Sequence, residues 1–139
     1  MKNQINRKKR KLSYTLMEIA IVIAVIALLG TLTAPLYFRH LKKARQSTAK
    51  TQVMLLQQAI LDFKIDTGKI PSSLDDLVKN PGVKGWDGPY LQGNLPKDPW
   101  GNDYVLLVPG KNSDFEVLCY GSDGQQGGSG EAEDISSWN

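Results

Sequence analysis

An α+β fold, in which one long N-terminal helix packs against a small antiparallel β-sheet, is predicted by three features of the 139-residue sequence. Residues 19–38 form an uncharged apolar stretch, and apolar residues then recur at helical spacing as far as residue 63. Two short segments rich in β-branched and aromatic residues follow in the C-terminal half. Together these features predict a transmembrane and amphipathic helix followed by a compact domain.

The positive charge of the chain is concentrated at its N-terminus. Residues 1–13 hold six Lys or Arg and no acid, whereas the remaining 126 residues hold 11 basic and 14 acidic residues, a net charge of −3. A nucleic-acid-binding domain would spread basic residues over a folded face. The charge distribution therefore argues against a nucleic-acid partner and indicates a short basic leader.

The uncharged stretch, residues 19–38, is long enough to cross a membrane. Twenty helical residues rise by about 30 Å, which matches the hydrocarbon core of a bilayer. A cleaved secretory signal is the alternative, but its apolar core would be shorter. In addition, residues 32–35 (Leu-Thr-Ala-Pro) make a poor signal-peptidase site. A membrane-spanning helix is the favoured interpretation.

Glu18 is the only charged residue between Lys11 and Arg39. A carboxylate at membrane depth costs about 2–3 kcal/mol, so it indicates a functional group that needs a partner. Alternatively, Glu18 lies at the helix start, reaches the lipid headgroups and is favoured there by the helix dipole. The residues alone leave both interpretations open.

Residues 9–18 (Lys-Arg-Lys-Leu-Ser-Tyr-Thr-Leu-Met-Glu) resemble the processing site of type IV pilins and pseudopilins. The resemblance implies that a prepilin peptidase cleaves between Ser13 and Tyr14 and that Tyr14 is then N-methylated. It also implies that Glu18 of one subunit pairs with the new ammonium group on Tyr14 of its neighbour during filament assembly. Ser13 departs from the family pattern, which usually has glycine before the cleaved bond.

Beyond the apolar stretch, one helix face remains apolar up to residue 63. A helix over residues 14–67 is expected, with a kink or local unwinding at Pro35 and a C-terminal cap at Gly68. Apolar residues spaced by three and four predict the buried stripe of this helix, which consists of Ala49, Val53, Leu56, Ile60 and Phe63.

The remaining chain is expected to cover that stripe. Residues 73–78 predict a short helix capped by Ser73, and residues 104–108 and 115–119 predict two strands joined by residues 109–114. Two or three antiparallel strands would then lie across the helix. With the pilin-like resemblance, this divides the chain into a leader (1–13), a transmembrane helix half (14–38) and a periplasmic domain (39–139).

Three further segments resemble the major pseudopilin of type II secretion systems in particular. They are residues 88–91 (Gly-Pro-Tyr-Leu), 95–102 (Leu-Pro-Lys-Asp-Pro-Trp-Gly-Asn) and 120–124 (Tyr-Gly-Ser-Asp-Gly). The resemblance implies a homopolymer, the periplasmic pseudopilus that drives protein export, assembled with minor pseudopilins and an inner-membrane assembly platform. It also implies a single-pass protein of the bacterial inner membrane. Trp100 and Trp138 are expected to pack in the core.

Residues 121–134 contain five glycines and four acids. Composition alone favours a solvated, disordered tail. The resemblance implies instead that this loop binds one Ca²⁺, a hard cation that takes carboxylate and carbonyl oxygens. Asp123 and Asp134 match the family's acidic ligands best, Tyr120 offers its backbone carbonyl, and Glu131 is a weaker match.

Two other functions are compatible with parts of the sequence. A type IV pilus or DNA-uptake subunit is the first, although many such pilins carry a C-terminal disulfide that a chain with Cys119 alone cannot form. A membrane-tethered periplasmic enzyme is the second. The one soft nucleophile of such an enzyme would be Cys119, which is far along the chain from His40. Cys119 is better explained as a small, buried hydrophobic residue. We therefore expect no enzymatic activity.

Overall fold

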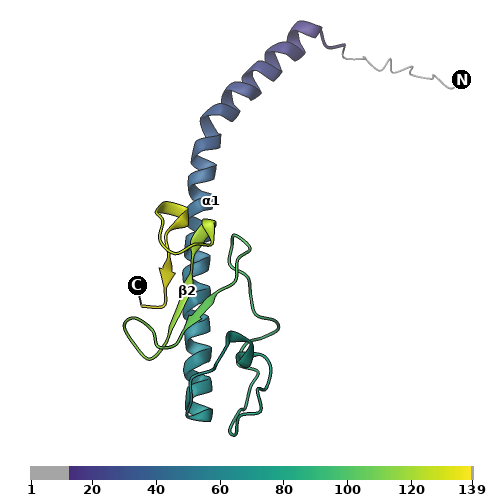
Figure 1. Ribbon diagram of the computed structural model, residues 1–139. Helices are drawn as coiled ribbons and strands as arrows, with labels where there is room; N and C mark the ends of the chain where they lie inside the picture. The colour runs from purple at the N-terminus through teal and green to yellow at the C-terminus, as the bar shows by residue number, and fades with distance from the viewer. Residues whose placement is uncertain (1–12, 139) are drawn as a thin grey trace, which may run out of the picture. The chain divides into compact units, whose positions relative to one another are not determined.

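The computed structural model describes residues 13–138. The predicted leader, apart from Ser13, therefore lies outside the described residues. The helix α1 (Leu16–Thr67) is followed by the short 3₁₀ helix η1 (Leu74–Leu77) and the strands β1 (Val105–Leu107) and β2 (Glu116–Cys119). The 3₁₀ turns η2 (Gly121–Asp123) and η3 (Gly130–Ala132) and the strand β3 (Ile135–Ser136) complete the chain (Figure 1). The predicted α+β fold is confirmed.

The helix α1 is 52 residues long and continues through Pro35 without local unwinding. Pro35 has no N–H group to donate to the preceding turn. Before Pro35, hydroxyls donate to backbone carbonyls of the same helix, Thr31 Oγ1 to Leu28 O at 2.7 Å and Thr33 Oγ1 to Leu29 O at 3.2 Å. At the other end, Gly68 has a φ of 71° and donates its N–H to Lys64 O at 2.9 Å, which is the predicted glycine cap.

All five residues of the predicted stripe are buried, none of them exposed by more than 1%. The rest of the chain supplies the partners that cover them. These partners come from η1, from the strands and from the residues next to them, and include Leu74, Leu77, Tyr104, Phe115, Val117 and Cys119. Periodicity in the sequence therefore located the helix side of the core correctly.

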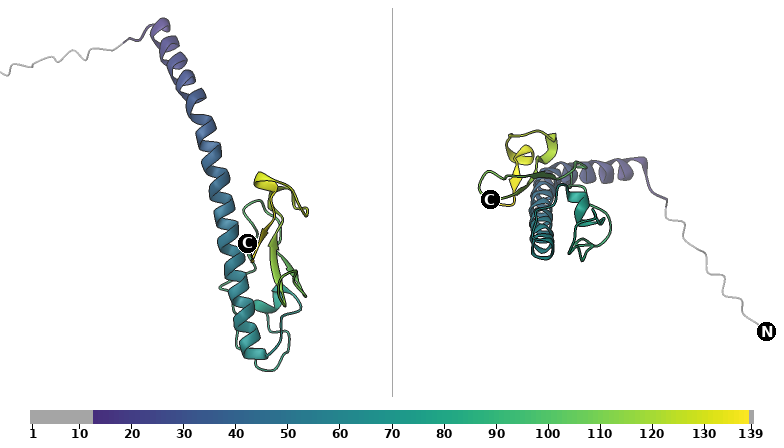
Figure 2. Two further views of the ribbon diagram at one scale, coloured as in Figure 1. Left: turned by 90° about the vertical axis from the view of Figure 1, so that its left-hand side faces the viewer. Right: turned by 60° about the horizontal axis from the view of Figure 1, so that its bottom comes forward.

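The sheet has the order β1-β2-β3, and both of its pairings are antiparallel. Leu106 lies opposite Val117, and Cys119 lies opposite Ile135. The strands run beside the C-terminal part of α1 in both views of the domain (Figures 1 and 2). The two predicted strands are confirmed with slightly shorter bounds, and β3 is the third.

The short helix predicted after α1 is the 3₁₀ helix η1, and Ser73 is its N-cap residue. The Asp76 carboxylate accepts hydrogen bonds from the backbone N–H groups of Ser72 and Ser73 at 2.9 and 3.2 Å. With only four residues, η1 presents Leu74 and Leu77 to the core and then ends.

The two tryptophans expected in the core differ. Trp100 is partly buried and packs against the core. Trp138, by contrast, is 45% exposed, so its predicted burial is wrong. Its indole N–H donates to Phe115 O at 3.0 Å, which places the ring at the sheet edge beyond β3.

The chain divides into two units, Met1–Arg39 and His40–Asn139. In the first unit, the large hydrophobic side chains of the helix are exposed, from 45% at Ile19 to 92% at Leu16. The helix is long and apolar enough to cross a membrane by length and composition. The second unit holds the core and the sheet.

Adjacent leucines on α1 test the core directly. Leu56 is 1% exposed and Leu55 is 60% exposed. We expect Leu56→Ala to lower the free energy of unfolding by about 2–5 kcal/mol, because it leaves a cavity in the core. Leu55→Ala should change it by less than about 1 kcal/mol. Urea unfolding of the detergent-solubilised chain, followed by near-ultraviolet circular dichroism, measures both; equal losses would contradict this packing.

Candidate functional site

The first turn of α1 is organised by Thr15. Its hydroxyl accepts the backbone N–H of Glu18 at 3.1 Å, which satisfies one of the donors left free at a helix start. Glu18 therefore lies in the first helical turn, and its side chain is exposed. This position is favourable for a carboxylate because of the helix dipole, and it leaves the side-chain oxygens available to another molecule.

The tail loop, residues 120–134, folds back on itself through close backbone contacts. A methyl group added at Gly121 would lie 2.5 Å from Glu131 O, and one added at Gly128 would lie 2.4 Å from Ala132 O. Both glycines also have positive φ, of 67° and 95°. Only glycine fits such positions without strain, so the glycine content allows η2 to lie directly against η3.

The acids of this loop occupy different environments. The Asp134 carboxylate accepts the N–H of Gly127 through Oδ2 at 2.9 Å, while its Oδ1 is buried and has no hydrogen-bond partner among the described residues. Asp123 is exposed, and its Oδ1 accepts the N–H of Gln125 at 3.1 Å. The Asp134 Oδ1 is thus directed away from solvent and open to a ligand, and the Oε1 of Glu131 is likewise buried without a hydrogen-bond partner in the described part of the chain.

Glu131 is directed toward α1. Its carboxylate lies 3.4 Å from Lys42 Nζ and 4.0 Å from the Arg45 guanidinium. Gln46, on the same side of the helix, donates to Gly130 O at 2.5 Å. Together these contacts hold η3 on the helix. The sequence did not predict this role of Glu131. The only signal for it was the group of basic residues after the apolar stretch, which are Arg39, Lys42, Lys43 and Arg45.

The donor set of the loop limits what it could hold. Within residues 13–138, no three His, Cys, Asp or Glu side chains are placed to bind a metal ion by themselves. An ion in this loop would take most of its ligands from backbone carbonyls, as calcium does in flexible glycine-rich loops. The open, buried Oδ1 of Asp134 is an oxygen of the kind that such an ion takes. Asp123 and Tyr120 belong to the segment around η2, which contacts η3.

A buried carboxylate, Asp98, organises the segment opposite η2. Asp98 is 5% exposed, and its Oδ1 accepts the backbone N–H groups of Trp100 at 3.0 Å and Asn102 at 2.7 Å. Its Oδ2 accepts the thiol of Cys119 at 3.3 Å. The link from Asp98 to Cys119 connects residues 21 positions apart and had no sequence signal.

Cys119 is completely buried in β2. Burial raises the pKa of its thiol to about 11, and the hydrogen bond to Asp98 contributes in the same direction. At neutral pH the residue is therefore a thiol and a poor nucleophile. This environment suits a small core residue.

The strand β3 is attached to β2 through a second buried acid. Glu116 is 3% exposed; it accepts the hydroxyl of Ser136 at 2.6 Å and the backbone N–H of Lys111 at 3.1 Å. These two hydrogen bonds lower the pKa of Glu116 although burial opposes the change. Glu116 therefore ties the C-terminal strand and the hairpin connection to the middle of the sheet.

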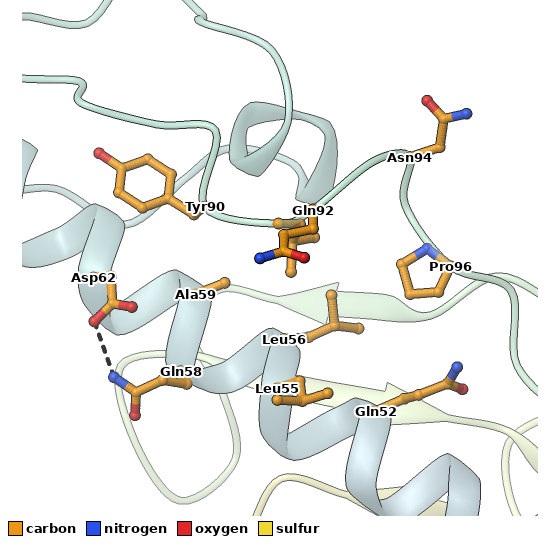
Figure 3. A pocket seen from close by; sticks show the side chains of 11 residues that line it. Gln52, Leu55, Leu56, Gln58, Ala59, Asp62, Tyr90, Gln92, Asn94 and Pro96 are labelled. Carbon is orange, nitrogen blue, oxygen red and sulfur yellow. Dashed lines mark hydrogen bonds between the residues drawn. The ribbon is translucent and has the colours of Figure 1, made fainter.

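A groove of about 540 Å³ runs between α1 and residues 90–96 (Figure 3). Its lining is mainly aliphatic and amide side chains, such as Leu55, Gln58 and Gln92. Gln58 donates to the carboxylate of Asp62 at 2.9 Å, as the dashed line in Figure 3 shows. Asp62 is the only acid in this lining, which contains no base or nucleophile to pair with it.

Comparison with known proteins gives consistent matches along the chain. The family model for the type II secretion system (T2SS), protein G, matches residues 37–138. The type II secretion system core protein G of Vibrio cholerae is 34% identical over 140 residues, covering 96% of this chain and 95% of that protein. The core protein G of Xanthomonas campestris is 40% identical over 122 residues, covering 87% of this chain and 85% of that protein.

A solved structure is also similar. It is the crystal structure of the major pseudopilin from the type 2 secretion system of enterohaemorrhagic Escherichia coli. The TM-score is 0.60 at 29% sequence identity, and the alignment covers 73% of this chain and 92% of that chain.

The environment of Glu116 predicts a pH dependence of stability. Because folding lowers the pKa of Glu116, its contribution is complete above the ordinary value of 4.5 and is lost as the pH falls below it. We expect the free energy of unfolding to decline less steeply below about pH 4.5 in Glu116→Gln than in the parent chain. Urea titrations between pH 7 and 3 measure this slope.

Folding also lowers the pKa of Asp76 and Asp114, so part of the decline should remain in the Glu116→Gln variant. Asp75→Asn, an exposed neighbour of Asp76, is the matched control and should follow the parent curve. Parallel slopes for Glu116→Gln and the parent chain would show that Glu116 titrates alike in the folded and unfolded states.

Proposed function

We infer that this chain, which belongs to the type II secretion system protein G family, is a major pseudopilin: a structural subunit that polymerises into the periplasmic pseudopilus driving protein export. The observation that carries this is similarity over 96% of the chain to a core protein G. The similarity thus includes the apolar helix as well as the domain. We infer a homopolymer that assembles with other components of the secretion system.

The exposed N-terminal half of α1 supports polymerisation. Its apolar side chains are not covered by the rest of the described chain, and burying each would contribute about 1.5–3 kcal/mol. The lipid bilayer covers this surface before assembly, and the equivalent helices of neighbouring subunits replace the lipid in the filament. We propose that the chain crosses the inner membrane once, with its C-terminal domain in the periplasm.

Glu18 would set the register between subunits. We propose that prepilin peptidase cleaves between Ser13 and Tyr14, that Tyr14 is N-methylated, and that its ammonium group pairs with Glu18 of a neighbouring subunit. An ion pair in a low-dielectric helical core is strongly attractive, whereas either charge alone is penalised there. Minor pseudopilins and an inner-membrane assembly platform are the further partners that we propose.

We propose that the tail loop binds one calcium ion. Asp134 would contribute its buried, open Oδ1, and Asp123 and the Tyr120 carbonyl are the other proposed ligands. Glu131 is a weaker candidate because its carboxylate lies beside Lys42 and Arg45. When bound, calcium would supply two positive charges to a loop that contains four acids. It would also link the segment that carries Asp123 to the segment that carries Asp134.

Substitution of Glu18 tests the assembly proposal. Glu18→Ala should abolish pseudopilus assembly, because it removes the partner of the Tyr14 ammonium group, while membrane insertion stays intact. Shearing assays and electron microscopy of cells that overproduce the chain measure assembly. Membrane fractionation measures insertion, and mass spectrometry of the N-terminus checks for methylated Tyr14. Gln58→Ala, at an exposed position on the same helix, is the control; filaments of normal number from Glu18→Ala would refute the proposal.

Calcium removal tests the second proposal. The detergent-solubilised full chain should melt at a higher temperature in millimolar calcium than in chelator, because an ion that binds only the folded state stabilises it. Asp134→Asn should reduce this difference strongly, whereas Asp87→Asn, an exposed acid outside the tail loop, should preserve it. Coincident melting curves for the parent chain with and without calcium would exclude the site.

A further inference from the structure

The side chain of Asn102 connects the Asp98 turn to the tail loop. Its Nδ2 donates to the carbonyl oxygen of Gly121 at 3.0 Å, across 19 positions in the sequence. A methyl group added at Gly124 would lie 3.4 Å from Asn102 Oδ1. One amide group therefore binds Gly121 and lies close to Gly124, the two ends of the segment that carries Asp123.

Asn102 is itself held in place by a buried group. The Asp98 carboxylate accepts the Asn102 N–H at 2.7 Å, and the Asp98 N–H donates to Asn102 O at 2.9 Å. The other oxygen of Asp98 accepts the Cys119 thiol, two residues before Gly121. The Asp98 turn thus fixes Cys119 directly and Gly121 through Asn102, and Tyr120 lies between these two fixed points.

The tail loop has two arms, one that carries Asp123 and one that carries Asp134. The position of Gly121 determines how these two arms meet. Its Cα faces the backbone of Glu131 and Ala132 so closely that an added methyl group would lie 2.5 Å from Glu131 O. Asp134 follows two residues after Ala132 and is anchored to Gly127 by its other oxygen. Displacing Gly121 would change the separation between the Asp123 arm and the Asp134 arm.

We infer that Asn102 is a positioning residue for the cation site of the tail loop: its amide, oriented by Asp98, holds the Gly121 carbonyl and so sets the spacing of the two ligand-bearing arms. The inference rests on the proposed binding of calcium. It concerns a residue outside the loop that contributes no ligand of its own.

The chemistry of the amide suits this role. A neutral donor can hold a carbonyl group beside a divalent cation without adding positive charge, which a lysine or arginine could not do. Calcium sites built largely from backbone carbonyls have few strong ligands, so their affinity depends on how well the backbone is placed before binding. Residues that orient the ligands of a metal typically change affinity ten- to a hundredfold when they are replaced.

Calcium titration of the detergent-solubilised full chain tests the inference. Isothermal titration calorimetry should give a calcium Kd for Asn102→Ala that is about tenfold higher than that of the parent chain. Relative to the parent chain, Asn102→Ala should lower the melting temperature more in calcium than in chelator. Asn94→Ala, which removes an exposed amide from the loop near the groove, is the matched control and should leave the Kd unchanged.

The outcomes are distinguishable. An unchanged Kd for Asn102→Ala, with melting temperatures lowered equally in calcium and in chelator, would assign Asn102 a purely structural role and overturn the inference, while calcium binding would stand. No binding by the parent chain would overturn both. Should Asn102→Ala not fold, Asn102→Gln, which keeps the amide but displaces it by one methylene, should raise the Kd in the same direction; parent-like affinity in that variant would also overturn the inference.

Discussion

Much of the apolar surface of α1 is exposed in the described part of the chain. The sheet and loops bury one stripe of the helix after residue 48, and that stripe forms the core. Between Leu16 and Phe38 the large side chains are 45% to 92% exposed. Such a helix is stable only in a bilayer or against other helices, since each exposed side chain would otherwise remain in water. Insertion into a membrane and polymerisation are two ways of burying the same apolar surface.

The features that could be predicted from the sequence are those with a regular period or a strict local requirement. The stripe from Ala49 to Phe63 follows helical spacing, and Gly68 occupies the positive-φ position that ends a helix. The two strands after residue 103 are continuous runs of strand-forming residues. Each of these features depends on neighbours within a few positions, so the sequence contains the whole signal.

The features that were missed depend on contacts between distant segments. Cys119 to Asp98, Glu131 to Lys42, and Glu116 to Ser136 each join residues 20 or more positions apart. The strand β3 has only two residues and exists because β2 offers it a free edge. Trp138 was expected in the core on the basis of its size, yet its indole N–H finds an acceptor at the sheet edge and the ring stays half exposed. Composition likewise could not separate the acids of the tail loop, which differ through their surroundings.

The place of β3 in the chain has a consequence for biosynthesis. Its residues, Ile135 and Ser136, are translated after those of α1 and β2, and β2 lacks this partner until they emerge. Ribosomes add residues at about 5–20 per second, so the helix is complete well before the sheet can close. During that interval the stripe around Leu56 and Phe63 is not yet covered by the complete sheet. A chain truncated before β3 would leave part of this apolar surface exposed, because Ile135 packs against the core.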